Sequence, residues 1–187
     1  MADVLYTSDL HIGHEKVAGE RGFGSADAHD EAMAEMWCAG VGRKDTVWIL
    51  GDLSPDLDAG LGWIAKLPGT KHLITGNHDP CFPGNRGSHK VQRAYFEHFE
   101  SVQLAAQHTI ADATVYLSHF PVSIDRPGKR ERFWKLRDEG QLLLHGHTHS
   151  TTKLTSPHEL HVGVDAWSRP VTREDVAELF GLPTISA

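Results

Sequence analysis

Side chains that can bind metal ions recur along this sequence directly after short apolar segments. Five such segments are each followed by residues that carry a carboxylate, an amide or an imidazole group. In chain order these residues are Asp9, His11 and His14, then Asp52, then Asn77, His78 and Asp79, then His119, and finally His145, His147 and His149. Ligands of α/β folds collect at the carboxyl ends of strands, so we expect these side chains to converge on one site.

The types of donor in this set suit divalent cations. Imidazole nitrogens and carboxylate oxygens bind Mn, Fe, Zn, Ni or Co, and no cysteine is among them, so a thiolate site is not expected. Asp52 stands alone after its segment and could bridge two cations through its two oxygens, while Asn77 offers an amide oxygen. One tetrahedral ion needs fewer ligands than the set provides, and we expect two ions held by Asp9, His11, Asp52, Asn77, His119, His145 and His147.

Two such ions predict phosphoryl chemistry. Metal ions roughly 3.5–4 Å apart clamp a phosphoryl group and lower the pKa of a bridging water, which yields hydroxide for in-line attack near neutral pH. The departing alkoxide still needs a proton. His78 is next to Asn77 and spare as a ligand, so it suits that role, and Asp79 is expected to hold the His78 ring through its other nitrogen.

The elements that must position these residues alternate between strand-like and helix-like patterns. Strands are predicted at residues 4–8, 46–50, 72–75, 102–106, 114–119, 141–146 and 159–165. Helices are predicted at residues 27–39, 56–67 and 88–99, and from Thr172, which forms a capping-box pattern with Asp175, to about Phe180. Strands that alternate with helices and later follow one another closely indicate a layered α/β fold with a partly mixed sheet.

The bulk properties limit the classes of function. A chain of 187 residues suits a single domain over residues 1–187. The formal net charge of −7 argues against a stable nucleic-acid partner, since such affinity rests on many basic side chains. No apolar run is long enough to span a membrane, no signal peptide is evident, and Cys38 and Cys81 are expected to be free thiols. These features predict a cytoplasmic protein and leave its oligomeric state open.

The ordered set resembles a known family. Asp9-Leu-His11, Gly51-Asp52, Gly76-Asn77-His78-Asp79, His119, and Gly146 flanked by His145 and His147 resemble the five motifs of the calcineurin-like metallophosphoesterase superfamily, in family order. The additional His14 and the His119-Phe120-Pro121 stretch resemble small phage and bacterial members. The resemblance implies an α/β fold in which a β-sandwich of two mixed sheets is flanked by helices.

The resemblance also implies roles for individual residues. One metal ion would be held by Asp9, His11, Asp52 and His147, and the other by Asp52, Asn77, His119 and His145. His78 would be the proton donor or transition-state stabiliser, with Asp79 behind it, and manganese would fill one or both positions. Leu53-Ser54-Pro55 after the second motif lacks the arginine of the protein Ser/Thr phosphatase branch, which disfavours that activity.

The leading hypothesis is a phosphodiesterase that acts on small or nucleotide phosphodiesters, with 2′,3′-cyclic nucleotides as leading substrates. The absence of an obvious cap domain predicts an open site. The alternatives are a phosphomonoesterase or nucleotidase with the same centre, a less favoured nuclease, and a non-catalytic binding scaffold on the same fold.

For several residues the sequence leaves a functional role open or indicates only a surface or structural role. His14 and His149 could touch substrate or metal, or support the ligands. The basic stretch Arg126 to Arg137 is either a solvated surface or a phosphate clamp, and Phe133 and Trp134 in it either stack on a base or anchor the core. His29 and His89 are predicted to lie on solvated helix faces. No role is expected for a further set, predicted to be at the surface or partly buried: His72, His98, His108, His158 and His161.

Overall fold

The first sheet is built mainly from parallel strands of the N-terminal half. The computed structural model describes residues 2–124 and 128–183. The first sheet has the order β10-β1-β2-β3-β4, in which only β10 is antiparallel to its neighbour. Its strands are β1 (Val4–Thr7), β2 (Thr46–Leu50), β3 (Thr70–Ile74), β4 (Ser101–Gln103) and β10 (Val171–Thr172). The parallel strands β1, β2 and β3 bring their carboxyl ends to one edge of the sheet.

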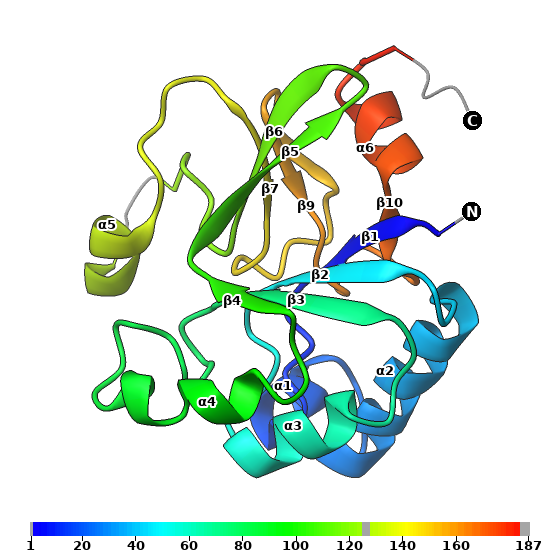
Figure 1. The fold of residues 1–187 in the computed structure, drawn as a ribbon, viewed down its shortest axis with the longest axis vertical. Coiled ribbons are helices and arrows are strands. Elements are labelled where there is room, and N and C mark those ends of the chain that lie inside the picture. Colours follow the sequence, from blue (N-terminus) through cyan, green and yellow to red (C-terminus); the bar gives the residue numbers. More distant parts are fainter. Residues whose placement is uncertain (1, 125–127, 184–187) are drawn as a thin grey trace.

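The second sheet comes from the C-terminal half and is mixed. Its order is β5-β6-β7-β9-β8, with β6, β7 and β9 parallel to one another. Its strands are β5 (Ala105–Ile110), β6 (Ala113–Ser118), β7 (Leu142–His145), β8 (Leu154–Ser156) and β9 (Glu159–His161). Figure 1 shows this sheet packed against one face of the first sheet. The predicted fold of two mixed sheets with flanking helices is therefore confirmed.

Helices cover the opposite face of the first sheet (Figure 1). They are α1 (Glu15–Glu20), α2 (Ala26–Gly40), α3 (Leu57–Ile64) and α4 (Gln92–Tyr95), with the short 3-10 turn η1 (Ser88–Lys90) before α4. Beside the second sheet lie α5 (Lys129–Trp134) and α6 (Arg173–Leu179). None of the helices in the described ranges is both long and apolar enough to cross a lipid bilayer.

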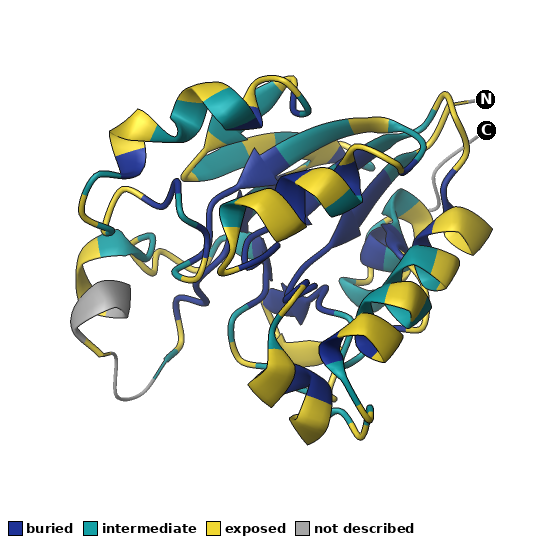
Figure 2. Ribbon diagram, turned by 90° about the horizontal axis from the view of Figure 1, so that it is seen from below, coloured by how far each residue is buried: buried dark blue, intermediate teal, exposed yellow. Residues whose placement is uncertain are grey.

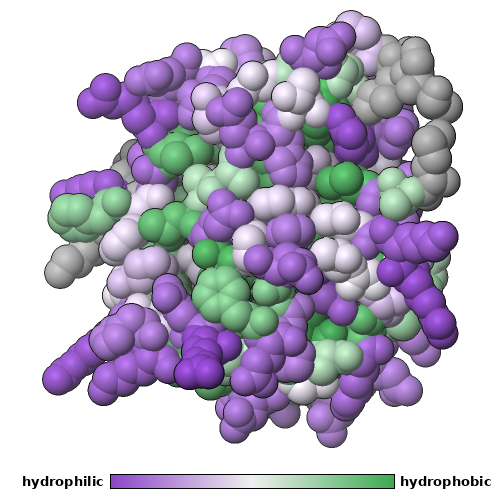
Figure 3. All heavy atoms as spheres, in the orientation of Figure 1, coloured by the Kyte–Doolittle hydropathy of each residue, from purple (hydrophilic) through white to green (hydrophobic). Residues whose placement is uncertain are grey.

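Alternation along the central strands creates two cores, one on each face of the first sheet. Leu5, Ile49 and Leu73 face the helices and pack with residues such as Trp37. Their strand neighbours face the second sheet, where the core includes Tyr6, Leu50, Ile74, Val115, Leu117 and Leu144. Figure 2 shows the central strands buried and the outer helix faces exposed, and Figure 3 shows hydrophilic side chains over much of the surface seen in Figure 1.

Two predicted elements are divided in the structure. The strand predicted at residues 102–106 is two strands in different sheets, because the chain leaves β4 at Gln103 and enters β5 at Ala105. The helix predicted at residues 88–99 consists of η1 and α4, the first entered from Gly87 in a left-handed conformation. In both cases the sequence pattern continues without a break, whereas the chain changes direction because of tertiary packing.

The predicted capping box at α6 is confirmed, and it gives a test of stability. Thr172 Oγ1 accepts from the Asp175 backbone N–H at 3.1 Å, and Thr172 N–H donates to Asp175 Oδ2 at 2.8 Å. Arg169 also donates two hydrogen bonds to the same carboxylate. Burial alone raises the pKa of Asp175, but these hydrogen bonds outweigh it and lower the pKa from 3.8 to about 2.

We expect Asp175→Ala to lower the free energy of unfolding by about 1–2 kcal/mol at pH 7, the usual scale for a lost helix cap. A carboxyl with a depressed pKa stabilises the fold above its unfolded value and loses that contribution as the pH falls through the folded value. The difference between variant and wild type should therefore shrink as the pH falls from about 4 to about 2. Urea unfolding across this range measures it, and a difference independent of pH would contradict the assignment.

Candidate metal centre

Backbone hydrogen bonds tie together the loops that follow the strands. The segment after β1 pairs with the segment after β2, because Asp9 N–H donates to Gly51 O at 3.0 Å and His11 N–H donates to Asp52 O at 2.9 Å. In the second sheet, Gly146 N–H donates to His119 O at 3.0 Å. Between the sheets, Val164 N–H donates to Ser8 O at 3.2 Å, so the carboxyl ends of strands from both sheets meet, as the strand-end pattern predicted.

The backbone is strained at five of the candidate residues. Positive φ values occur at Asp9 (58°), His11 (51°), Asp52 (54°), His147 (71°) and His149 (50°). Left-handed conformations cost a non-glycine residue free energy and concentrate at functional sites, where the surroundings hold them in place. Among the other described non-glycine residues this geometry occurs only at Ala111 and Asp112, in the turn between β5 and β6. Five of the seven strained non-glycine residues are therefore ones that the sequence pattern had selected.

Two glycines permit the close approach of these loops. A Cβ atom at Gly76 would collide with Asp52 Oδ1 and with the Asp52 backbone nitrogen. A Cβ atom at Gly146 would collide with Ser8 Oγ and lie 2.7 Å from Asp9 Oδ2. Gly76 and Gly146 are therefore required, because a side chain at either position would collide with the carboxylates.

One group of donors combines residues from both sheets. Potential ligand atoms of Asp9, His11 and His149 lie within 4.8 Å of one another. The Nε2 atoms of His11 and His149 are 3.0 Å apart. Burial lowers the pKa of His11 to about 3, which leaves a neutral imidazole. Burial raises the pKa of Asp9, but the nearby imidazoles of His161 and His119 outweigh it and hold the pKa well below its usual range.

A second group lies beside the first. Potential ligand atoms of Asp52, His119 and His147 lie within 4.8 Å of one another. His119 Nε2 is 3.4 Å from Asp52 Oδ2 and 3.2 Å from Asn77 Oδ1. His119 Nδ1 donates to Leu50 O at 2.8 Å. Burial lowers the pKa of His119, but the charge and hydrogen bond of Asp52 outweigh it and raise the pKa to about 9, so Nε2 would lose its proton when an ion binds there. The ring is thus oriented with its ligating nitrogen toward Asp52 and Asn77.

Asp52 connects the two groups. Its Oδ2 lies 3.6 Å from His11 Nε2 in the first group and 3.4 Å from His119 Nε2 in the second. Burial raises the pKa of Asp52, but the charge and hydrogen bond of His119 outweigh it and lower the pKa to about 2. Ionised carboxylates and a neutral His11 are the forms that bind metal ions, so the donors present fit divalent cations.

The histidines around Gly146 are assigned to the two donor groups differently from the expectation. We expected His147 with Asp9 and His11, and His145 with Asp52 and His119. The structure places His147 with the second group and His149 with the first. His145 is the last residue of β7, so the strand pleat sets its direction, and its Nε2 lies 2.7 Å from Thr155 Oγ1. The signal that the sequence offered was the His-Thr-His run after Gly146.

A pair of variants distinguishes the expected assignment of the histidines to the donor groups from the one in the structure. We expect His149→Ala to weaken Mn²⁺ binding at least about tenfold, because it removes a nitrogen ligand. Mutation of a residue that only hydrogen-bonds to a metal ligand already lowers metal affinity about 10–100-fold. His145→Gln should change Mn²⁺ affinity by less than about threefold, since its partner is Thr155. Isothermal titration of folded variants measures both. A larger loss of affinity in His145→Gln than in His149→Ala would instead support the ligand assignment that the family resemblance implied.

The Asp79 carboxylate accepts hydrogen bonds from main-chain N–H groups in this structure. Asp79 is fully buried, and its carboxylate accepts from the backbone N–H groups of Asp52 (3.0 Å), Leu53 (2.9 Å) and Gly76 (2.8 Å). Burial and the charge of Asp52 raise the pKa of Asp79 to about 7. We expected this residue to hold the His78 ring. That role stays a prediction, and the contacts described here join the loop that carries Asp52 to the loop that carries Asn77.

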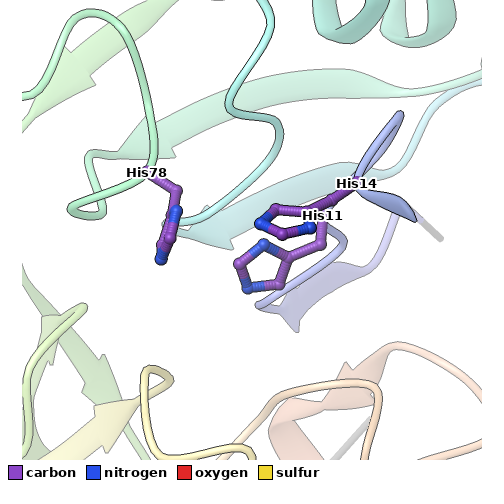
Figure 4. A group of neighbouring side chains, drawn as sticks. All are labelled: His11, His14 and His78. Atoms are coloured by element: carbon purple, nitrogen blue, oxygen red, sulfur yellow. The ribbon is translucent and has the colours of Figure 1, made fainter. Parts of the chain in front are cut away.

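His78 is exposed and forms a third group with His11 and His14, whose potential ligand atoms lie within 4.8 Å of one another. Its backbone N–H donates to Asp52 Oδ1 at 2.8 Å. Its ring centroid lies 5.1 Å from that of His11 and 5.7 Å from that of His14. Figure 4 shows His78 on the loop after β3, across from His11 and His14 on the loop after β1. His14 Nδ1 accepts from the Val17 N–H at 3.4 Å and caps α1, so His14 also has a structural role.

Two histidines expected to be unimportant are buried, which corrects the sequence interpretation. His161 is fully buried, with Nε2 3.5 Å from Asp9 Oδ2. His29 was predicted on a solvated helix face, but it is fully buried and contacts Asp30 and Arg21. The contact of His161 with Asp9 joins segments far apart in the sequence, so a local pattern of helix and strand positions does not predict it.

The basic stretch Arg126 to Arg137 lies partly outside the described residues. Trp134 in α5 packs edge-on against Phe82, with ring centroids 5.5 Å apart, which agrees with an anchoring role. Phe133 is 70% exposed.

Comparison with known proteins agrees with this geometry. Residues 3–164 match the calcineurin-like phosphoesterase superfamily domain. The Gene 66 protein of Mycobacterium phage L5 is 43% identical over 195 residues, which cover 96% of this chain and 94% of that protein. A solved Aquifex aeolicus protein of unknown function has the same fold, with a TM-score of 0.70 and 20% identity over 96% of this chain and all of that one. The chain therefore belongs to the calcineurin-like phosphoesterase superfamily, a family that implies divalent metal ions.

Proposed function

We propose that this chain is a binuclear metal-dependent phosphodiesterase that hydrolyses small or nucleotide phosphodiesters. The observation that carries the proposal is the position of Asp52, whose Oδ2 lies within 3.6 Å of a ligand nitrogen in each donor group. A carboxylate between two groups of donors suits a pair of ions that share one ligand. Such a pair, when bound, supplies a nucleophile from water and neutralises charge on the phosphate oxygens.

The proposed ligand sets follow the geometry. One ion would be held by Asp9, His11, His149 and Asp52, and the other by Asp52, Asn77, His119 and His147. The donors are oxygen and nitrogen atoms that suit Mn, Fe, Zn, Ni or Co, and manganese is our first choice on family grounds. His119 is oriented by the Leu50 carbonyl and Asn77 is close to His119 Nε2, so part of the second set is held in place before any ion binds.

His78 is proposed as the group that protonates the leaving alkoxide. It is exposed and contacts both donor groups, because its ring lies beside His11 and its backbone N–H donates to Asp52. Asp79 supports this position by fixing the two loops through backbone N–H groups. A positioned imidazole contributes about 10²–10⁴-fold to a reaction of this kind.

A diester is favoured over a monoester by the charge at the site. A monoester dianion carries one more negative charge and gains more from a basic clamp. Among the side chains that the structure describes, Arg21 is the basic one that reaches the first donor group, and its guanidinium is engaged by Asp165, His29 and the Asp9 carbonyl. For this described part of the site, the charge available to a phosphate is thus mainly that of the metal ions, which suits the single negative charge of a diester.

The test is hydrolysis by metal-stripped protein to which Mn²⁺ is returned. Bis-p-nitrophenyl phosphate and p-nitrophenyl phosphate would be compared at equal concentration, with cyclic nucleotides next. We expect metal-dependent turnover of the diester to exceed that of the monoester at least about tenfold, a difference of ~1.4 kcal/mol in transition-state binding. Preference for the monoester would indicate a phosphatase or nucleotidase. Bound metal without turnover of either would support a binding scaffold.

A further inference from the structure

Arg21 is the centre of a buried network next to the first donor group. It lies at the C-cap of α1, and its side chain is only 11% exposed. Its Nε donates to Asp165 Oδ1 at 2.9 Å, and its Nη2 donates to Asp165 Oδ2 at 2.7 Å. This two-pronged ion pair joins the loop after α1 to the segment after β9. No sequence motif singled out either residue.

The same guanidinium holds the strained main chain of the first motif. Arg21 Nη2 donates to the Asp9 carbonyl at 2.8 Å, and its Nη1 lies 3.0 Å from His29 Nε2. His29 Nδ1 lies 3.0 Å from Asp30 Oδ1, so the ring donates to Asp30 and accepts from Arg21. Asp30 Oδ2 in turn accepts from the Gly13 N–H at 2.9 Å. The loop that carries Asp9 is therefore attached at Asp9 to the buried Arg21 guanidinium and at Gly13 to the partly exposed Asp30 carboxylate.

Asp165 faces a candidate ligand on its other side. Its Oδ2 lies 3.5 Å from His149 Nδ1, and the opposite nitrogen of this ring, Nε2, lies 3.0 Å from His11 Nε2. A carboxylate beside one ring nitrogen of histidine favours the tautomer with its proton there, which leaves the other nitrogen free to bind metal. The chain from Arg21 through Asp165 to His149 thus has the arrangement that orients metal ligands.

We propose that Arg21 and Asp165 are positioning residues that hold His149 and the Asp9 main chain for the metal ion at Asp9, His11 and His149. This inference rests on the proposed function, because it assumes that the first donor group binds an ion. A purely structural role is the alternative. A buried ion pair adds little net stability, since desolvation offsets the attraction, so stability alone is a weak reason for its place beside strained ligands.

The test measures Mn²⁺ binding by titration calorimetry of folded wild type, Asp165→Asn and Arg21→Lys. We expect Asp165→Asn to weaken one of the two ions about 10–100-fold and the other much less, the usual scale for groups behind metal ligands. Arg21→Lys keeps a cation but loses the two-pronged geometry, and should weaken the same ion by a smaller factor. It also carries the test if Asp165→Asn does not fold.

The matched control is Arg169→Lys, which alters the two-pronged pair of Arg169 with Asp175 at α6. It should leave the affinity for both ions unchanged. A second readout is the dependence of diester hydrolysis on metal concentration. Excess Mn²⁺ should restore kcat in Asp165→Asn, whereas damage to the fold would not be reversed by metal.

Unchanged Mn²⁺ affinity in a folded Asp165→Asn variant would overturn the inference, as would wild-type protein that binds no ion at the first group. Failure of the proposed function has a different signature. Wild-type protein would then bind two ions and hydrolyse no diester, while the variants still weakened one ion.

Discussion

Asp52→Asn is expected to abolish phosphodiesterase activity almost completely. Asp52 Oδ2 lies between His11 Nε2 and His119 Nε2, so its loss affects both donor groups at once. An amide oxygen ligates a divalent ion less strongly and cannot supply the negative charge that both ions would share. Each ion provides several kcal/mol of transition-state stabilisation, so we expect kcat/KM to fall at least roughly 10³-fold.

The measurement is hydrolysis of bis-p-nitrophenyl phosphate together with the number of Mn²⁺ ions bound per chain. The variant should bind fewer ions at concentrations that fill both positions in the wild type. A suitable control is Asp112→Asn, which alters another aspartate with positive φ, in the turn between β5 and β6 away from the donor groups. Full occupancy with unchanged turnover in Asp52→Asn would refute the shared-ligand assignment.

His78→Ala is expected to lower kcat about 10²–10⁴-fold while both ions remain bound, since a positioned general acid contributes on that scale. Its proposed role is to deliver a proton to the departing oxygen, so the loss should depend on the leaving group. A substrate that releases p-nitrophenolate needs little protonation and should be affected least. A dialkyl or nucleoside leaving group should be affected most.

The comparison of leaving groups separates this role from a ligand role. Loss of Mn²⁺ binding in His78→Ala would assign His78 to the metal ions instead. Equal loss for all leaving groups would indicate that His78 stabilises the phosphate rather than the alkoxide. His158→Ala is the matched control, because His158 is exposed just before β9, at the end of this strand far from the donor groups.

Much of the architecture could be predicted from local patterns. The runs around β1, β2, β6 and β7 were found because apolar and β-branched residues mark strands, and the α6 capping box was found because its two residues are three positions apart. These are short-range properties. They gave a wrong prediction at residues 102–106, where one apolar run contributes to two strands in different sheets.

The sequence by itself determined which residues are present at the strand ends, and so the donor chemistry of the centre and the superfamily to which the chain belongs. Only the tertiary structure decided which histidine joins which group. His145 is held by the pleat of β7, while left-handed backbone turns His147 and His149 toward partners in the other sheet.

The same distinction holds for the supporting residues. Asp79 contacts backbone of the β2 loop, His161 lies beside Asp9, and Arg21 meets Asp165, which is 144 positions away. Such contacts depend on how two sheets and their loops pack, and no local pattern of the chain records that packing.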